Sequence, residues 1–424
     1  MNIRAKIEDL KNKLKIPMVN NFISLVMLQG INFLLPLISY PYLIRTLEIE
    51  RYGLVYWALG IIQYFVTFTD FGFNLSGTKY ISQHRDHPDK INQFLNSAFI
   101  GRIGLGLISI VVFIILIFSF KRFHDEALLY LLYIGIIVGN VMFPVWFFQG
   151  MERMQYITIF NLIAKSLSLL PVFFFVKTPE HYIYVPVCYS IGYIIAGLFS
   201  IYFIYFRTGM KWFMPSFRSV WFALKDSSTY FLSRSSLSLF TNSNTFILGL
   251  VCGNVIQGYY TAAEQLFKAY EYLINPLSQV LFPHMSKTRD VGFFKKIFKR
   301  VVTANVLLVI VILLISKWVI FIYCGAEMEQ TLMVFRILLI AALFSIPSML
   351  VGYPYLAALG HPKYTNWTVV FTSCLHIGII AVFYVFNAIT LTHIAGLVVF
   401  SQILLLSLRG YGIKKFYYSN GANR

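Results

Sequence analysis

Apolar residues form long runs along the whole chain, and short polar segments separate these runs. A helix needs roughly 20 apolar residues to cross a bilayer, so the pattern predicts about a dozen membrane spans. The alternative, a membrane barrel, would show alternating strands of about ten residues, which this chain lacks. The predicted spans lie near residues 18–44, 54–78, 96–120, 127–149, 156–176, 182–206, 229–251, 259–284, 301–323, 331–358, 364–387 and 390–411.

Composition agrees with this pattern. Hydrophobic residues make up 58% of the chain and charged residues only 12%, whereas about a quarter of a soluble domain is charged. The predicted fold class is therefore an all-α integral membrane protein. The spans leave no room for a soluble domain.

Positive charge is distributed unevenly over the loops. If the N-terminus is cytoplasmic, loops and termini on that side carry 24 Lys and Arg residues, and the opposite side carries six. Positively charged loops stay in the cytoplasm, so both termini are predicted to be cytoplasmic. This asymmetry explains the net charge of +18 without nucleic acid, because such loops can contact anionic membrane lipids.

The two halves of the chain resemble each other at an offset of about 208 residues. "RYGLVYWA" at 51 has an echo in "QGYYTAAE" at 257, and "FQGMERMQY" at 148 has one in "AALGHPKY" at 357. We predict two pseudo-symmetric six-helix lobes, 18–206 and 229–411, around a central cavity. Repeats of this kind often place a substrate between the lobes and work by alternating access.

Three shorter segments complete the predicted organisation. Residues 1–17 have apolar residues on one helical face and Lys and Arg on the other, which is typical of an interfacial amphipathic helix. Residues 207–228 form a basic cytoplasmic linker between the lobes, and residues 412–424 form a cytoplasmic tail.

The span at 229–251 is too polar for a helix that faces lipid. Arg234, Asn242 and Asn244 lie among several Ser and Thr residues that surround most of its circumference. One interpretation is a tightly packed helix with interhelical hydrogen bonds. The other is one wall of a hydrated cavity that faces an oxygen-rich ligand, and the guanidinium of Arg234 favours it, because packing does not require a cation.

Charged residues within other spans allow two interpretations as well. Glu264 and Lys268 are four residues apart on one helical face, so they can form a structural ion pair, or Glu264 can couple transport to an ion gradient. Asp70, which precedes a helix break at "FGFN" and Asn74, is either a packing contact or a titrating group.

Other cations lie closer to the predicted ends of spans. Arg45 and Arg51 flank the first outer loop, where they serve as interfacial anchors or attract an anionic headgroup. Arg102, Lys165 and Arg336 are expected to extend their charged ends to a nearby interface.

No sequence motif supports catalysis. The chain has no G-x-x-x-x-G-K-[ST], H-E-x-x-H or G-x-S-x-G motif, and its loops are too short to enclose a sugar nucleotide. The four cysteines are far apart and lack metal-ligand spacing. We therefore predict a protein that is not an enzyme and that needs no cofactor or metal ion.

Several stretches resemble a known family. "LQGINFLLPLISYPYLIRTL" at 28, "YGLVYWALGIIQYFVTFTDFGFNLSGTKYIS" at 52, "FPVWFFQGMERM" at 143 and "INPLSQVLFPHMSK" at 274 are similar to the Wzx-type flippases of bacterial repeat-unit polysaccharides. Glycine is common after the "RTL" stretch in these proteins, whereas this chain has Glu48.

The resemblance implies the multidrug, oligosaccharidyl-lipid and polysaccharide (MOP) exporter fold in a bacterial inner membrane. The implied substrate is an oligosaccharide linked to undecaprenyl diphosphate, such as an O-antigen repeat unit, moved to the periplasmic leaflet. Arg234 and Lys268 would bind its diphosphate, and Asn242 and Asn244 its sugars. Asn74, Arg45 and Arg51 are further candidate contacts. A polysaccharide polymerase and a chain-length regulator are candidate partners.

Three other functions are alternatives to this one. A multidrug antiporter of the same fold would favour an aromatic and acidic cavity. A membrane-embedded polysaccharide polymerase or ligase would typically carry a large periplasmic loop, but no predicted outer loop exceeds about a dozen residues. A scaffold that does not transport should tolerate loss of the Arg234 charge.

Overall fold

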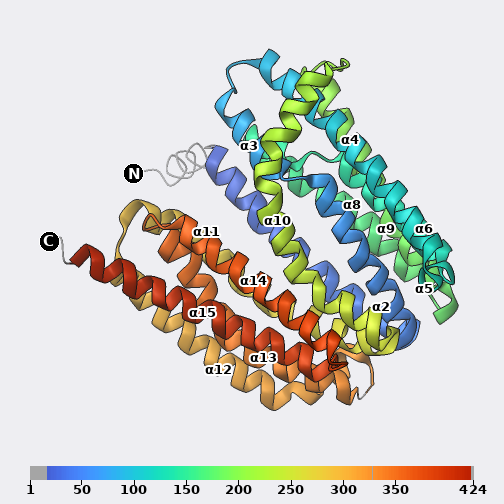
Figure 1. Cartoon of the computed structure of the whole chain (residues 1–424), viewed down its shortest axis with the longest axis vertical. Helices are drawn as coiled ribbons and strands as arrows, with labels where there is room; N and C mark the ends of the chain where they lie inside the picture. Colours follow the sequence, from blue (N-terminus) through green and yellow to red (C-terminus); the bar gives the residue numbers. More distant parts are fainter. Residues whose placement is uncertain (1–16, 327, 422–424) are drawn as a thin grey trace, which may run out of the picture. The chain divides into compact units, whose positions relative to one another are not determined.

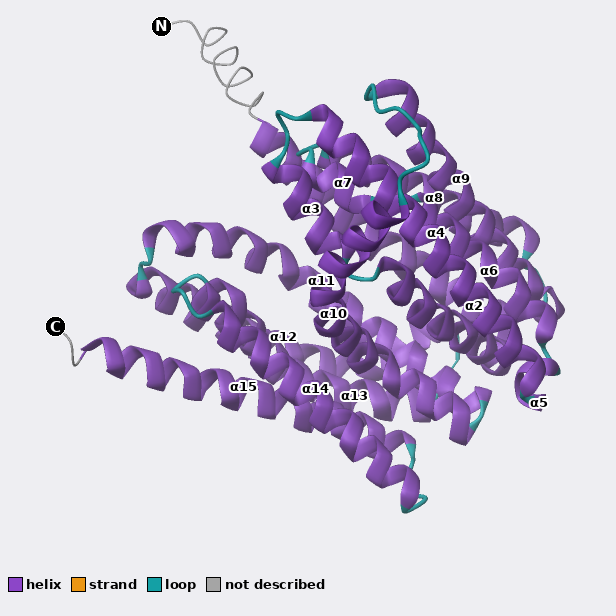
Figure 2. Ribbon diagram, turned by 45° about the horizontal axis from the view of Figure 1, so that its top comes forward, coloured by secondary structure: helices purple, strands orange, loops and turns teal. Residues whose placement is uncertain are grey.

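The computed structural model describes residues 17–326 and 328–421, and the predicted helix at 1–17 lies almost wholly outside this part of the chain. The described part is built from helices joined by short loops, without a strand (Figure 2). Nine of its helices are long and apolar enough to cross a membrane. The predicted all-α membrane fold is thus confirmed.

The chain divides into two compact units, which are described separately. Unit 1 contains residues 1–39 and 61–235, and unit 2 contains residues 40–60 and 236–424. Two helices, α2 (Pro17–Asp70) and α10 (Phe217–Cys252), contribute residues to both units. The lobe boundaries expected from the sequence stay a prediction.

Unit 1 is completed by seven helices and a short 3-10 turn. They are α3 (Phe73–Gln83), α4 (Pro88–Ser119), α5 (Lys121–His124), α6 (Ala127–Met142), α7 (Val145–Gly150), α8 (Met154–Phe175), η1 (Pro179–Ile183) and α9 (Tyr184–Arg207). Helix α9 packs against both α6 and α8 (Figure 1), and α3 packs against α7 (Figure 2). Aromatic residues form the core near α7, where Trp146, Phe147 and Phe148 are fully buried.

Unit 2 contains five further long helices. They are α11 (Asn254–Thr288), α12 (Val291–Cys324), α13 (Glu329–Leu350), α14 (Pro362–Val385) and α15 (Leu391–Gly421), and the π-helical turn η2 (Val351–Ala357) follows α13. Helix α13 is the central element, because it packs against α11, α12 and α15. Its apolar segment is the most buried of the candidate spans, as expected for a helix enclosed by neighbours.

Helices α10 and α15 extend beyond the predicted spans. Helix α10 begins at Phe217, so the second half of the predicted linker is helical. Helix α15 continues to Gly421, so most of the predicted tail is helical too.

Two helix breaks are held by buried arginines. In unit 1 the chain leaves α6 at Met142 and resumes in α7 after Pro144, and Arg102 of α4 donates hydrogen bonds to the carbonyl of Asn140 at 2.9 Å and to that of Phe143 at 3.4 Å. The Arg102 side chain is 1% exposed. The expectation that Arg102 reaches an interface is therefore wrong, because its charge satisfies carbonyl groups that the break leaves without helical partners.

The second break lies at the end of α13 in unit 2. Arg409 of α15 donates to the carbonyl of Ser348 at 2.6 Å, next to Pro347 and the turn η2. A Cβ atom at Gly352 would lie 2.8 Å from the guanidinium carbon, so only glycine lets the arginine approach this closely.

The predicted first outer loop is instead an almost continuous helix. Only Glu48 leaves the helical conformation inside α2, with φ 60° and ψ 165°. The segment after it packs closely on the start of α11, since a Cβ atom at Gly53 would lie 2.0 Å from the carbonyl oxygen of Asn254. This backbone conformation is readily adopted only by glycine, so Glu48 is strained by about 1–3 kcal/mol.

We predict that Glu48→Gly stabilises the protein, because glycine adopts this conformation without strain. The expected gain in the free energy of unfolding is about 1 kcal/mol, measured as a higher thermal midpoint in detergent. Glu50→Gly is the matched control, since Glu50 is exposed and helical, and there glycine should cost about 1 kcal/mol. Equal shifts in both variants would show that Glu48 is not strained.

Candidate functional site

The most strongly charged part of α11 carries an ion pair in unit 2. Lys268 Nζ lies 2.7 Å from Glu264 Oε2, one helical turn away. The side chain of Glu264 is 10% exposed and that of Lys268 is 34% exposed. Glu271 also interacts electrostatically with Lys268. The pair therefore joins a buried glutamate to a lysine whose side chain is partly exposed.

A second polar group joins three helices of the same unit. His376 of α14 is 1% exposed, and its two ring nitrogens lie 2.9 Å from Asn244 Oδ1 on α10 and 2.8 Å from Ser401 Oγ on α15. The ring of Phe240 packs edge-on against the imidazole at 4.8 Å between centroids. Each ring nitrogen has a partner, as a buried histidine requires.

These two groups form one polar chain through unit 2. The side chain of Tyr260 on α11 lies near Asn244 and interacts electrostatically with Glu264. The chain thus runs from His376 through Asn244 and Tyr260 to the Glu264–Lys268 pair, and we refer to these five residues as the polar chain. Three of its members, Asn244, Glu264 and Lys268, were predicted from the sequence.

The neighbouring amide on α10 is placed differently. Asn242 is half-buried, and its Nδ2 donates to the carbonyl of Ser238 in its own helix at 3.1 Å. Among the described residues, its amide is therefore bonded within its own helix and not to the polar chain. The side chain of Arg234 lies outside those that the structure describes, so its role stays a prediction.

Two other candidates lie together in unit 1. Asn74 Nδ2 donates to Asp70 Oδ2 at 2.7 Å across the predicted "FGFN" interruption, which is present. Gly72 forms this turn with φ 82°, and a Cβ atom there would lie 2.6 Å from the carbonyl oxygen of Ser227. The Asp70 carboxylate also interacts electrostatically with the buried Arg102. Its negative charge therefore has both a hydrogen-bond donor and a cation nearby.

Arg45 and Arg51 lie on either side of Glu48. Arg45 donates to the carbonyl of Ile322 in the last turn of α12, where a cation is favourable for a helix C-terminus. Gly325, which ends that helix with φ 79°, leaves room for the arginine. Arg51 is half-buried. Arg45 thus supports the end of a helix, and its predicted role towards a headgroup is untested.

The sequence interpretation missed His376, Tyr260 and Ser401. A signal for His376 was present, because α14 carries a row of buried polar residues at helical spacing: Thr365, Thr368, Thr372, Ser373 and His376. A membrane helix that buries its polar face and exposes its apolar face must pack that polar face against other helices. Tyr260 likewise lies among the buried polar residues Gln257, Thr261 and Glu264 of α11.

No group of three or more His, Cys, Asp or Glu residues that could hold a metal ion occurs in the described part of the chain. The polar chain is a row of hydrogen-bonding groups that ends in a lysine whose side chain is one-third exposed. Such an arrangement can bind an anionic, oxygen-rich ligand.

Comparison with known proteins assigns the fold first. A multidrug-resistance transporter of the MATE family and MOP superfamily, in an inward-facing conformation, has a TM-score of 0.67 and 12% sequence identity, over 95% of this chain and 100% of that one. A MOP-superfamily transporter from Pyrococcus furiosus gives 0.63 and 14%, over 94% and 95%. The fold is that of a two-lobe, all-α membrane transporter.

Sequence comparison then assigns the family. The family described as "Polysaccharide biosynthesis protein" matches residues 18–289, and the chain belongs to this family. A candidate O-antigen transporter of Escherichia coli (strain K12) is 28% identical over 278 residues, which are 65% of this chain and 67% of that protein. One from Shigella dysenteriae is 27% identical over 282 residues, 66% and 70% of the two chains. The resemblance predicted from the sequence is confirmed.

We predict that His376 and Asn244 stabilise unit 2 as a pair. His376→Ala and Asn244→Ala should each lower the free energy of unfolding. The double variant should lose about 1 kcal/mol less than the sum of the two single losses, because the shared hydrogen bond is lost only once. Thermal unfolding in detergent measures all three. His393→Ala is the control, since this exposed histidine bonds to Ala388 in its own neighbourhood, and its effect should add to that of Asn244→Ala. Additivity for His376 as well would contradict the pairing.

Proposed function

We propose that this protein is a flippase that moves an undecaprenyl-diphosphate-linked oligosaccharide from the cytoplasmic to the periplasmic leaflet by alternating access. The oligosaccharide is a repeat unit of O-antigen or a similar surface polysaccharide. Membership of the polysaccharide biosynthesis family and similarity to candidate O-antigen transporters support this substrate class. The protein acts as a transporter without catalysing a chemical step.

The charged and partly exposed side chain of Lys268 is the observation that carries the proposal. An uncompensated cation at bilayer depth is costly, and Glu264 offsets this cost while leaving a third of the lysine side chain exposed. A diphosphate could take over the hydrogen bonds of Lys268 as a charge-assisted acceptor. Arg234 is the second cation we assign to the diphosphate.

Sugar hydroxyl groups require donors and acceptors. Asn242 is the better candidate of the two predicted amides, because its hydrogen bonds among the described residues go to Ser238, one turn away in its own helix. Asn244 would have to release His376, so we assign it an indirect role in positioning α10. Asn74, Arg45 and Arg51 remain proposed contacts along the path.

Coupling to an ion gradient would use Asp70 or Glu264. Both carboxylates lie next to a cation, so binding of a proton or sodium ion would weaken that pairing. Release of Lys268 by Glu264 would link ion binding to diphosphate binding. The coupling hypothesis is wrong if transport into vesicles does not respond to an imposed ion gradient.

The proposed location is the bacterial inner membrane, with both termini in the cytoplasm. A polysaccharide polymerase and a chain-length regulator are the proposed partners, because a translocated repeat unit must be polymerised on the periplasmic side. The uneven distribution of Lys and Arg supports this orientation.

We predict that Lys268→Gln impairs polysaccharide export, because glutamine keeps a polar, hydrogen-bonding side chain but not the charge. In a strain that lacks the gene, this variant should restore surface polysaccharide at least tenfold less well than the wild type, since a charged hydrogen bond contributes about 1.5–3 kcal/mol. Lipid-linked repeat units should accumulate at the same time.

Lys287→Gln is the matched control, since Lys287 is an exposed lysine in the last turn of the same helix. It should restore polysaccharide fully, and immunoblotting must give equal membrane levels of both variants. Full export by Lys268→Gln at an equal level would remove Lys268 from the proposed mechanism.

A further inference from the structure

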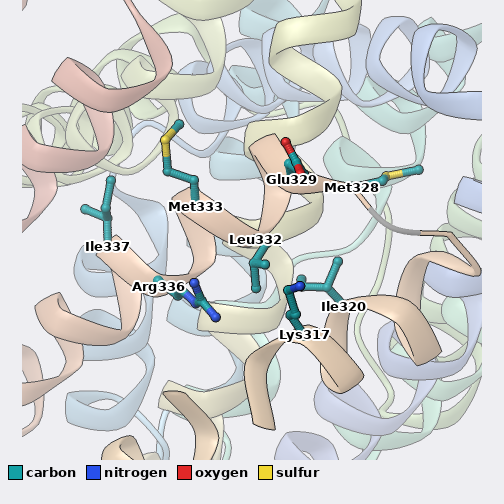
Figure 3. Close-up of a pocket in the computed structure, with 8 residues that line it drawn as sticks. All are labelled: Lys317, Ile320, Met328, Glu329, Leu332, Met333, Arg336 and Ile337. Atoms are coloured by element: carbon teal, nitrogen blue, oxygen red, sulfur yellow. The ribbon is translucent and has the colours of Figure 1, made fainter. Parts of the chain in front are cut away.

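Unit 2 has a pocket of about 440 Å³ between the end of α12 and the start of α13. It lies within the size range of small-molecule sites. Figure 3 shows its lining: Lys317, Ile320, Met328, Glu329, Leu332, Met333, Arg336 and Ile337. Two cations and one carboxylate accompany five apolar side chains, so the pocket is apolar with a positive balance. None of the residues proposed for transport lines it.

The two cations lie at the same depth. Lys317 is seven residues before the last residue of α12, Cys324, and Arg336 is seven residues after the first residue of α13, Glu329. At 1.5 Å per residue, both are about 10 Å inside their helix ends. In Figure 3 their charged groups lie on either side of Leu332 in projection.

Arg336 is oriented for binding by its own neighbour. Its Nε donates to Ser316 Oγ at 2.9 Å, and Ser316 itself is fully buried. This bond uses the inner nitrogen of the guanidinium, so the two terminal nitrogens can face a ligand. A guanidinium with parallel donors and an ammonium group together match a phosphate group.

The surface around the pocket is suited to lipid rather than to water. Leu314 and Trp318 on α12 are 78% and 70% exposed, and Ile322 is 67% exposed. Tryptophan is enriched at membrane interfaces. A ligand with an apolar part can therefore cover the apolar lining while its anionic group reaches the cations.

We infer that this pocket binds a phospholipid, with the phosphodiester between Lys317 and Arg336. The part of an acyl chain nearest the headgroup lies along Leu332, Met333 and Ile337. Glu329 accepts a hydrogen bond from the hydroxyl or ammonium group of the lipid head. On the topology predicted from the positive charges, the site faces the periplasmic leaflet. This inference does not rest on the proposed transport function.

Native mass spectrometry of the full-length protein in neutral detergent tests the inference. The probes are phosphatidylglycerol, phosphatidylethanolamine, and a diacylglycerol with the same acyl chains. We expect the wild type to retain a phospholipid but not the diacylglycerol. Lys317→Gln and Arg336→Gln should each weaken retention about tenfold, because each removes one charged contact.

Lys121→Gln is the matched control, since Lys121 is an exposed cation of unit 1 that is predicted to lie on the same side of the membrane. Its substitution should leave lipid retention unchanged. Within the described part of the chain, Lys317 makes no hydrogen bond or ion pair. The Lys317 variant should therefore fold even if the Arg336 variant does not. Wild-type retention by Lys317→Gln would overturn the inference.

Two further results would also overturn it. Retention of diacylglycerol as strong as that of phospholipid would indicate a purely apolar groove. Displacement of the lipid by millimolar inorganic phosphate would indicate a site for a free anion in solution.

Discussion

A membrane interior offers no water to pair with polar groups, and this constraint explains most of the unusual residues in the chain. Each break in a membrane helix leaves carbonyl groups without donors. Arg102 supplies donors at the break between α6 and α7, and Arg409 does so where α13 passes into η2. Each arginine belongs to a different helix from the break whose carbonyl groups it binds. These hydrogen bonds therefore also join two helices.

The same constraint gives the polar chain its form. His376 is hydrogen-bonded to Asn244 between α14 and α10, Tyr260 of α11 lies near Asn244 and Glu264, and Glu264 offsets the charge of Lys268. Every member is buried or paired, and only the side chain of Lys268 is partly exposed. A network of this kind fixes the positions of α10, α11 and α14. Because Lys268 stays partly exposed, the same residues can both pack the helices and bind a ligand.

The sequence predicted the all-α membrane fold, because apolar runs of span length allow no other solution for the backbone. It also predicted the Glu264–Lys268 pair, since residues four apart on a helix are neighbours. It did not predict where Arg102 lies, because the carbonyls that need it belong to residues about 40 positions away. The sequence showed that Glu48 replaces a residue that is often glycine in the resembling family, but it did not predict the strained backbone there, with φ 60° and ψ 165°. The functional roles of Arg234, Asn242 and Asp70 remain predictions.

The most direct test of the central claim uses the purified protein in vesicles loaded with a fluorescent undecaprenyl-diphosphate-linked oligosaccharide. A glycosidase that cannot cross the membrane reports how much substrate has reached the outer leaflet. The account predicts that accessible substrate rises with time in vesicles with the wild-type protein and stays near the protein-free level with Lys268→Gln. Equal accessibility with and without the wild-type protein would contradict it.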